Sequence, residues 1–560
     1  MTDYSILIGG AAGQGMDTIS LLLEKTINRL GYFVFSNKDY MSRIRGGHNF
    51  VGIRFSNRPI SSHRIDYDLI VALNEETIKL HQDQLTGRGI IICDENTGEK
   101  SQKVLPFPLM QLAKASGNPR TLGTVASGVV LKMLGLPLEP FLEVLKGTFK
   151  GNVLEANFKA AHSGYSLGEK LFDVDPADKE RRILINGNQA IALGALASGL
   201  KFYSAYPMTP STSIMNYLVS KMDKAEIVVE QAEDEIAAIN MAIGASFAGV
   251  RAMTGTSGGG FSLMVEALGL AGMLETPLVI AEVQRPGPAT GLPTRTEQSD
   301  LKFVLSASHG EAPRMVIALR NEEDCFYQTV RAFNLADRYQ IPVILLSDQY
   351  LADSSASCRP FDFSKVTIER NIAGEEILKP GENYKRYAYT ESGISPRILP
   401  GKHPGYTVLV DSDEHDEEGR IIEQAEERTR MVNKRLAKME GLKKELQEPI
   451  QLGNPNPEIL LLAWGSTYGP LKEAVEALSG EGLSIGALVF GDIWPLPTLT
   501  LTRLADKAKK IVNVEVNATG QLASLVREAA LIPCHQSILK YDGRPFSGQE
   551  LYRRIVKEVL

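Results

Sequence analysis

Short apolar runs recur along the chain, and amphipathic stretches with a helical repeat separate them. Strands of a buried parallel sheet read as short continuous apolar runs, because helices cover both faces of the sheet. In the central part of the sequence the two patterns alternate regularly, which predicts a doubly wound parallel sheet. The expected strands are 226–230, 250–254, 277–283, 314–318 and 341–347, and the expected helices are 188–199, 211–223, 234–248 and 260–273.

Both ends of the chain repeat this alternation, so we expect an α/β protein with three α/β domains. The segments predicted from these patterns and from composition shifts are 1–178, 179–360, 361–455 and 456–560. In the first, strands are expected at 4–8, 50–55, 69–73 and 89–93, with a helix beginning near Met16; in the last, strands at 458–463, 484–490 and 511–516 and a helix at 470–478.

The third segment has a different composition. An acidic stretch at 411–418 precedes a strongly charged run that ends at Glu448. Apolar residues at near-helical spacing predict one long amphipathic helix here, and we expect a solvated helix that joins two domains. The apolar positions are Ile421, Ala425, Met431, Leu436, Met439, Leu442 and Leu446.

Composition excludes several classes of protein. The 560 residues are too many for one core, and a net charge of -7 does not favour nucleic-acid binding. Four cysteines stand far apart without a CxxC pair, so we expect no structural zinc or iron–sulfur cluster held by this chain alone. Without a signal peptide or an apolar run of about 18 residues, no membrane span is predicted. We expect a cytoplasmic protein.

The loop that follows the apolar run 277–283 combines rigidity with many polar groups. Residues 285–301 contain three prolines and two glycines, together with Arg285, Thr294 and Gln298. Ligands of open α/β sheets bind beyond the carboxyl ends of the strands, where this loop begins. It is therefore either a binding loop or a proline-stiffened surface connection.

Two segments near the N-terminus could hold anions. The turn 9–15 is rich in glycine between a strand and a helix, which favours either phosphate binding or a purely structural turn. Its glycine spacing departs from the dinucleotide fingerprint, so NAD is disfavoured. The loop 43–49 carries Arg43, Arg45 and His48, and it could meet an acidic substrate or a pantetheine phosphate, or it could simply be solvated surface.

Three further segments in the central part lie at strand–helix junctions. In 206–213, Thr209 stands between two prolines, although Ser211 or Ser213 could merely cap the next helix. Acidic residues crowd the helix start at 230–235, where most should be favoured by the helix dipole. One that faced the apolar side would have a raised pKa and could hold a proton, but the pattern does not say which. The glycines of 254–261 permit close backbone approach.

Taken together, these motifs resemble the alpha subunit of 2-oxoacid:ferredoxin oxidoreductases, in the form with the gamma domain fused at its N-terminus. The resemblance covers nearly the whole chain. Its most specific part is the loop Gly-Pro-Ala-Thr-Gly-Leu-Pro-Thr-Arg-Thr-Glu-Gln-Ser-Asp-Leu (287–301). It also rests on Tyr-Pro-Met-Thr-Pro-Ser-Thr (206–212), on 233–245 and on 256–262, and Met208 stands where the family more often has Ile. The layout looks most like 2-oxoglutarate oxidoreductases.

The resemblance implies how the domains work. The first would be a gamma-type domain, the second the pyrimidine-binding domain for thiamine diphosphate, and the last a transketolase C-terminal-like domain. A separate beta subunit would hold the diphosphate, Mg²⁺ and a [4Fe–4S] cluster, in an (alpha-beta)₂ heterotetramer. The enzyme would decarboxylate 2-oxoglutarate oxidatively, pass the electrons to ferredoxin and form succinyl-CoA with coenzyme A, or run the reverse carboxylation.

The resemblance also implies residue roles. Glu235, nine residues before Gly244, would bond N1′ of the aminopyrimidine as the catalytic acid, with Pro207 as a second cofactor contact. Glu233 and Asp234 would be charges at the helix start. Arg285 would pair with the substrate carboxylate, beside the hydroxyls of Thr209 and Thr294. Arg45 or His48 would bind the distal carboxylate of 2-oxoglutarate.

Other interpretations stay open. The same chemistry could act on pyruvate, a branched-chain or an indolic 2-oxoacid. A protein of another class would be a non-catalytic scaffold or nucleotide-binding subunit, which the presence of Glu235, Arg285 and Thr294 disfavours. Single-subunit NAD-linked chemistry is disfavoured by the glycine spacing.

Overall fold

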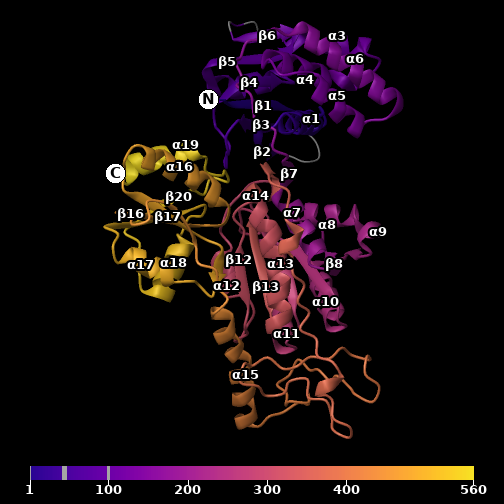
Figure 1. The fold of residues 1–560 in the computed structure, drawn as a ribbon, viewed down its shortest axis with the longest axis vertical. Coiled ribbons are helices and arrows are strands. Elements are labelled where there is room, and N and C mark those ends of the chain that lie inside the picture. The colour runs from indigo at the N-terminus through magenta and orange to yellow at the C-terminus, as the bar shows by residue number, and fades with distance from the viewer. Residues whose placement is uncertain (1, 41–46, 98–100, 102) are drawn as a thin grey trace. The chain divides into compact units, whose positions relative to one another are not determined.

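The chain folds into two compact units, each with its own core. A computed structural model describes residues 2–40, 47–97, 101 and 103–560. Unit 1 comprises 1–186, 353–360 and 547–553, and unit 2 comprises 187–352, 361–546 and 554–560. Figure 1 shows the elements of both units along the chain.

Unit 1 is a mixed sheet with helices packed on it. Its order is β6-β5-β4-β1-β3-β2-β14-β7. The strands from β6 to β1 are parallel, and those from β3 onward are antiparallel to their neighbours. The elements are β1 (Asp3–Ala11), α1 (Met16–Arg29), β2 (Phe33–Tyr40), β3 (His48–Ser56), β4 (Tyr67–Ala72), α2 (Glu75–His81), β5 (Leu85–Asp94), β6 (Val104–Phe107), α3 (Leu109–Ala115), α4 (Leu122–Met133), α5 (Glu139–Thr148), α6 (Gly151–Leu167), β7 (Ile183–Asn186) and β14 (Ser355–Cys358).

The expected strands of the first domain are confirmed, and the structure adds others. β2 was not predicted, because its run Phe-Val-Phe-Ser-Asn-Lys-Asp-Tyr turns polar halfway. β7 and β14 lie within 179–360 in sequence, yet they pair with each other and, through β2, with the sheet of unit 1. Strands that pair over such a distance in sequence produce no local pattern, so their membership of this sheet could not be predicted.

The central sheet of unit 2 has the order β18-β12-β13-β11-β10-β8-β9. It is parallel, as predicted, except for the edge strand β18, which pairs antiparallel with β12. Helices α7 with α13 and α10 with α11 pack on it. The elements are α7 (Gly187–Ala197), β8 (Leu200–Ala205), α8 (Thr212–Val219), α9 (Met222–Ala225), β9 (Val228–Gln231), α10 (Glu235–Phe247), β10 (Arg251–Thr256), α11 (Gly258–Met273), β11 (Leu278–Gln284), α12 (Leu301–Leu305), β12 (Met315–Ala318), α13 (Glu322–Tyr339), β13 (Pro342–Asp348), α14 (Gln349–Asp353) and β18 (Asp492–Trp494).

The C-terminal part of unit 2 contains a second sheet, β15-β17-β16-β19-β20. Its buried residues belong to the same apolar core as α10, α11 and β11, so the two sheets of unit 2 are packed together. Its elements, with the helix that precedes them, are α15 (Ala425–Lys443), β15 (Ile450–Gly453), β16 (Ile459–Trp464), α16 (Tyr468–Gly480), β17 (Ile485–Phe490), α17 (Leu499–Ala505), β19 (Lys510–Glu515), α18 (Gln521–Ala530) and β20 (Gln536–Leu539). The residues of the last helix, α19 (Gly548–Glu558), are divided between unit 1 and unit 2.

Helix α15 exists as predicted, but its predicted apolar stripe faces inward only in part: Met431 and Leu442 are buried, whereas other members are not. Leu436 is 38% exposed, and Ile421, before the helix, is 58% exposed. The buried residues of the helix include Lys434, Arg435 and Lys438. The helix is therefore held against the protein by charged side chains and is not merely solvated. It lies beside the irregular segment 361–424 (Figure 1).

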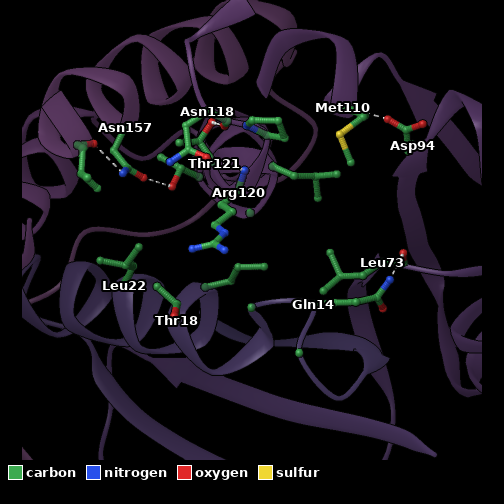
Figure 2. A pocket seen from close by; sticks show the side chains of 18 of the residues that line it. Gln14, Thr18, Leu22, Leu73, Asp94, Met110, Asn118, Arg120, Thr121 and Asn157 are labelled. Atoms are coloured by element: carbon green, nitrogen blue, oxygen red, sulfur yellow. Dashed lines mark hydrogen bonds between the residues drawn. The ribbon is translucent and has the colours of Figure 1, made fainter. Parts of the chain in front are cut away.

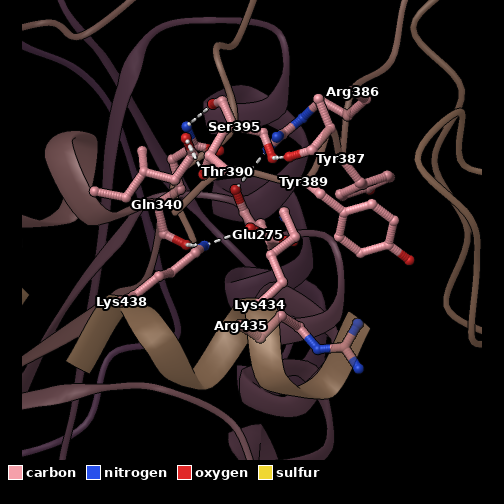
Figure 3. Close-up of polar contacts among 12 residues, drawn as sticks. Glu275, Gln340, Arg386, Tyr387, Tyr389, Thr390, Ser395, Lys434, Arg435 and Lys438 are labelled. Atoms are coloured by element: carbon pink, nitrogen blue, oxygen red, sulfur yellow. Dashed lines mark hydrogen bonds and ion pairs between the residues drawn. The ribbon is translucent and has the colours of Figure 1, made fainter. Parts of the chain in front are cut away.

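The charges on α15 are matched by one buried carboxylate. Glu275, just after α11, lies 2.6 Å from Lys434 Nζ and 2.5 Å from Lys438 Nζ. Arg386 donates a 2.7 Å hydrogen bond to the Glu275 backbone carbonyl (Figure 3). Burial alone would raise the pKa of Glu275, but the two ammonium groups and Arg386 outweigh burial and hold it well below its usual range. The cluster fastens α15 and the irregular segment to the end of α11.

Candidate active site

Three loops of unit 2 begin at the same edge of the central sheet. Strands β8, β10 and β11 are parallel neighbours, so their carboxyl ends point the same way. The segments that follow them carry Thr209, the glycines that open α11, and Arg285. Carboxyl ends of parallel strands are where open α/β sheets bind ligands.

Glu235 is the buried acid at the start of α10. Asp234 caps this helix by accepting a 2.8 Å hydrogen bond from Ala237 N, and Glu233 and Asp234 are both exposed. Glu235 is only 4% exposed, and its Oε1 has no hydrogen-bond partner among the described residues. A Cβ added to Gly260 would lie 2.5 Å from that oxygen, so glycine permits the approach. The result is a buried acceptor turned toward the start of α11.

Arg285 and Thr209 are in direct contact. The Arg285 guanidinium donates a 2.8 Å hydrogen bond from Nη1 to the backbone carbonyl of Thr209. Burial lowers the pKa of Arg285, although the negative charge of Asp300 opposes this. An arginine remains protonated under such conditions. The contact places a cation at the strand ends beside the Thr209 turn.

The other predicted residues of this loop cluster are half-buried. Pro207 lies in the turn of Thr209, and Thr294 in the second half of the loop that starts at Arg285. The structure joins Arg285 to Thr209 directly, whereas Thr294 is placed with them only by its position in the loop.

Gln298 anchors that loop. Its Nε2 donates to the Trp464 carbonyl (3.0 Å), and its Oε1 accepts from Thr467 Oγ1 (3.0 Å) and from Val516 N (3.2 Å). Asn517 Nδ2 donates to the Gln298 carbonyl at 3.0 Å. Gln298 therefore has a structural role, which sequence reasoning did not separate from ligand binding.

Two acids before and at the end of this loop were not singled out from the sequence. Glu282 is a single charged residue in the apolar strand β11, and this was the signal that could have found it. Asp300 ends the loop directly before α12.

Unit 1 contains a cavity at its glycine-rich turn. Gly13 and Gly15 adopt φ values of 93° and 81°, and Gly15 immediately precedes α1. The cavity has a volume of about 850 Å³, within the range of small-molecule sites. The Arg120 side chain extends into it toward Thr18 of α1 (Figure 2). Its polar wall also includes Asn96, Asn118, Thr121 and Asn157.

His48 forms a pair with another imidazole of unit 1. Its Nε2 lies 2.8 Å from His81 Nε2, and His81 Nδ1 lies 2.7 Å from Gln84 Oε1. Burial and the neighbouring His81 lower the pKa of His48, which favours its neutral form. Arg45 and Arg43 lie outside the described residues.

Comparison with known proteins places the chain in a family. Three family models match successive parts of the chain: "Pyruvate ferredoxin/flavodoxin oxidoreductase" at 5–167, "Pyruvate flavodoxin/ferredoxin oxidoreductase, thiamine diP-bdg" at 193–434 and "Pyruvate:ferredoxin oxidoreductase core domain II" at 457–551. A 2-oxoacid:ferredoxin oxidoreductase subunit alpha of Sulfolobus sp is 34% identical, over 99% of this chain and 97% of its own length. The chain belongs to the 2-oxoacid:ferredoxin oxidoreductases.

Within this family of oxidoreductases, two further relatives cover nearly the whole chain. The 2-oxoglutarate oxidoreductase subunit KorA of Mycobacterium tuberculosis is 30% identical, over 98% of this chain and 90% of its own. A solved 2-oxoglutarate:ferredoxin oxidoreductase of Magnetococcus marinus, with 2-oxoglutarate, coenzyme A and succinyl-CoA bound, matches with a TM-score of 0.92. It is 31% identical and each chain is fully covered. The resemblance stated from the motifs is thus confirmed, and so is the α/β fold class.

The described residues contain neither a candidate membrane span nor a candidate metal-binding cluster. No helix among them combines the length and apolar character of a membrane span. Among the same residues, no three His, Cys, Asp or Glu side chains are grouped as a metal ion would require.

Proposed function

We propose that this protein is the alpha subunit of a thiamine-diphosphate-dependent 2-oxoglutarate:ferredoxin oxidoreductase. The complex oxidises and decarboxylates 2-oxoglutarate, transfers the succinyl group to coenzyme A and reduces ferredoxin, or runs the reverse carboxylation. The proposal rests on the contact between Arg285 and Thr209 at the carboxyl ends of the strands, where Glu235 is also buried. The Magnetococcus marinus enzyme, which was solved with this substrate and product bound, supports the choice of acid.

In this proposal Arg285 binds the carboxylate next to the keto group. A guanidinium can donate two parallel hydrogen bonds to a carboxylate, which fixes the acid in one plane. The hydroxyls of Thr209 and Thr294 donate to the oxygens of the substrate. Arg45 or His48 binds the distal carboxylate.

The residues around Glu235 suit the pyrimidine of thiamine diphosphate. The cofactor supplies, when bound, the electron sink that decarboxylation needs. Among the described residues the Glu235 Oε1 atom has no hydrogen-bond partner, which is what a carboxyl group kept for a ligand nitrogen requires. Glu235 holds the proton at N1′, and Pro207 shapes the adjoining wall. The family model matched at 193–434 is described as thiamine-diphosphate-binding, which supports this assignment.

The remaining chemistry belongs to a beta subunit. We place there the site for the diphosphate and Mg²⁺ and the [4Fe–4S] cluster that passes electrons to ferredoxin, in a cytoplasmic (alpha-beta)₂ heterotetramer. The names of the relatives, "subunit alpha" and "subunit KorA", support a multi-subunit enzyme.

Coenzyme A is assigned to the cavity of unit 1. The phosphates of this co-substrate match the exposed N–H groups at the start of α1 and the Arg120 guanidinium. Asp94 also lines the cavity, but its carboxylate accepts hydrogen bonds from Asn96 N (3.1 Å) and Met110 N (2.7 Å). These two donors offset its repulsion of an anion.

The test is an assay of the complex co-expressed with its partner subunit. CoA-dependent reduction of a viologen dye is measured with 2-oxoglutarate, pyruvate, branched-chain and indolic 2-oxoacids. We expect the highest kcat/KM with 2-oxoglutarate. A higher kcat/KM with another 2-oxoacid would make that acid the substrate in place of 2-oxoglutarate and leave the family unchanged. Absence of turnover with every acid, in a complex that contains all cofactors, would favour a non-catalytic subunit.

A further inference from the structure

Two consecutive backbone carbonyls in the turn between β8 and α8 are held by different elements. Thr209 accepts a hydrogen bond of 2.8 Å from Arg285 Nη1. Pro210 accepts a hydrogen bond of 2.9 Å from Nδ2 of Asn188, the second residue of α7. The same Nδ2 atom donates a 2.7 Å hydrogen bond to Ser213 Oγ. The turn is thus fixed between the guanidinium of the proposed substrate site and the side-chain amide of Asn188.

The serines of this turn do not have the capping role that their positions suggest. Ser211 precedes the first residue of α8, but it makes no side-chain cap hydrogen bond. Its hydroxyl instead donates a 2.8 Å hydrogen bond to the Met208 carbonyl. Ser213 accepts from Asn188. Both hydroxyls therefore hold the turn.

Asn188 is placed by a tightly packed helix. It is fully buried, at 0% exposure. A Cβ added to Gly187 would lie 2.5 Å from the Leu351 carbonyl oxygen in α14, and one added to Gly194 would lie 2.5 Å from the Phe326 carbonyl oxygen in α13. Because α7 approaches two other backbones this closely, it cannot shift without moving them. The core therefore fixes the position of the Asn188 amide, and the amide in turn holds the turn.

Only the donor side of this amide has partners in the part of the chain that the structure describes. Both hydrogen bonds leave from Nδ2, whereas Asn188 Oδ1 is buried without a hydrogen-bond partner there. The Pro210 carbonyl can only accept, so it needs an N–H or O–H group at this place. A side chain of nearly the same shape without a donor, such as leucine, could not hold it.

The same turn also reaches the surroundings of Glu235. Thr256 Oγ1 at the end of β10 lies 3.9 Å from Met208 Sδ. A Cβ added to Gly260 would clash with both Thr256 Oγ1 and Glu235 Oε1, so these two groups lie around one glycine. A shift of the turn would therefore affect both the proposed substrate cation and the region of the buried acid.

We propose that Asn188 is a positioning residue for substrate binding. By holding the Pro210 carbonyl, it sets the place of the Thr209 hydroxyl and of the Arg285 guanidinium relative to the substrate carboxylate. Asn188 itself touches no substrate atom. Without its donor the buried Pro210 carbonyl loses its partner, which costs free energy unless the turn shifts toward another donor. This role rests on the proposed function of Arg285 and Thr209.

Asn188→Leu removes the donor and keeps nearly the same shape. In the complex co-expressed with its partner subunit, KM for the 2-oxoacid should rise by about tenfold, while KM for coenzyme A should stay constant. The control Asn216→Leu makes the same substitution at an exposed position of α8 and should behave like the wild type. A merely structural role of Asn188 would reduce the amount of active complex and leave both KM values unchanged.

Hydrogen exchange of the substrate-free complex gives a readout that does not depend on turnover. Backbone amides of 206–214 should exchange faster in Asn188→Leu than in the wild type, and those of β11 should keep their wild-type rates. Exchange should stay close to that of the wild type throughout the chain in Asn216→Leu. Unchanged exchange of 206–214 in Asn188→Leu would overturn the hold of Asn188 on the turn.

A double-mutant cycle with Arg285→Lys tests whether the two residues act through one turn. If they do, the double variant should lose less kcat/KM than the product of the two single losses. A fully multiplicative loss would show independent actions and overturn the positioning role. An unchanged KM in Asn188→Leu beside an impaired Arg285→Lys would overturn that role alone. Wild-type kinetics of Arg285→Lys would refute the proposed function of Arg285 and the positioning role with it.

Discussion

Lys438 on α15 and Glu275 after α11 form an ion pair of 2.5 Å in which both side chains are 1% exposed. The two residues are far apart in sequence, and Lys434 makes a second ion pair with the same carboxylate. Removing one partner of a buried pair leaves an uncompensated charge, which costs more than the pair itself contributes. The attachment of α15 therefore depends on one carboxylate.

Glu275→Gln should destabilise unit 2. We expect a loss of about 3–5 kcal/mol, because two buried ammonium groups lose their counter-charge. Thermal or urea unfolding of the purified complex measures it. The control Glu440→Gln removes an exposed ion pair with Lys443 on the same helix and should cost at most about 1 kcal/mol. Equal effects of the two substitutions would contradict a structural role for the cluster.

Stability should depend on pH through Glu414. This carboxylate accepts two hydrogen bonds from Arg435, at 2.9 and 2.8 Å, and is also paired with Arg428. Burial alone would raise its pKa, but the two arginines outweigh burial and bring it to about 2. A depressed pKa in the folded state contributes stability that is complete above the ordinary value near 4.5 and is lost as pH falls toward 2.

The difference in Tm between wild type and Glu414→Gln should therefore be largest above about pH 5 and shrink on acidification. The exposed Glu382, 3.6 Å from Lys379, supplies the control Glu382→Gln, for which we expect a small difference throughout. A Tm difference that grows at low pH would show that the sign is wrong.

Arg285→Lys tests the carboxylate contact. Lysine keeps the charge but cannot make the planar two-bond contact, so kcat/KM for the 2-oxoacid should fall by about 10- to 100-fold. Steady-state kinetics of the complex measure this, with Arg527→Lys on the exposed side of α18 as the control. If both variants behave like wild type, Arg285 serves only to hold the Thr209 turn.

Arg120→Ala tests the cavity of unit 1. Loss of one charge-assisted contact with a phosphate should raise KM for coenzyme A by about tenfold, and KM for the 2-oxoacid should stay constant. The exposed Lys114 provides the control Lys114→Ala. An unaltered KM for coenzyme A in Arg120→Ala would contradict the assignment of coenzyme A to this cavity.

Gln298→Ala tests the loop anchor. The substitution leaves the Trp464 carbonyl and Val516 N without their partner, so hydrogen exchange across 294–301 should accelerate. In Gln298→Ala, hydrogen exchange in α10 should stay close to that of the wild type. In the control Gln231→Ala, which changes an exposed residue, exchange should stay close to that of the wild type throughout the chain. Uniform acceleration throughout unit 2 would indicate a global loss of stability instead.

Local patterns predicted many of the regular elements, especially in the central sheet. The expected helix at 234–248 is α10 (Glu235–Phe247), and the apolar run at 277–283 is β11 (Leu278–Gln284). These elements follow from short-range periodicity, which the sequence carries directly. The candidate site residues followed from a resemblance of motifs, and the structure adds the contact between Arg285 and Thr209.

What could not be predicted depends on distant partners. Leu436 fits a helical apolar stripe yet is exposed, because Glu275 draws Lys434 and Lys438 inward. An ion pair between residues that are distant in sequence produces no periodic pattern from which it could be predicted.

The anchoring of Gln298 divides the loop into two parts that are held differently. Its second half is tied to backbone groups of the C-terminal sheet, so substitutions there disturb two sheets at once. The tip at 287–292 is exposed and carries no such ties among the described contacts. The tip can therefore move without disturbing either sheet, while the anchor keeps the second half of the loop in place.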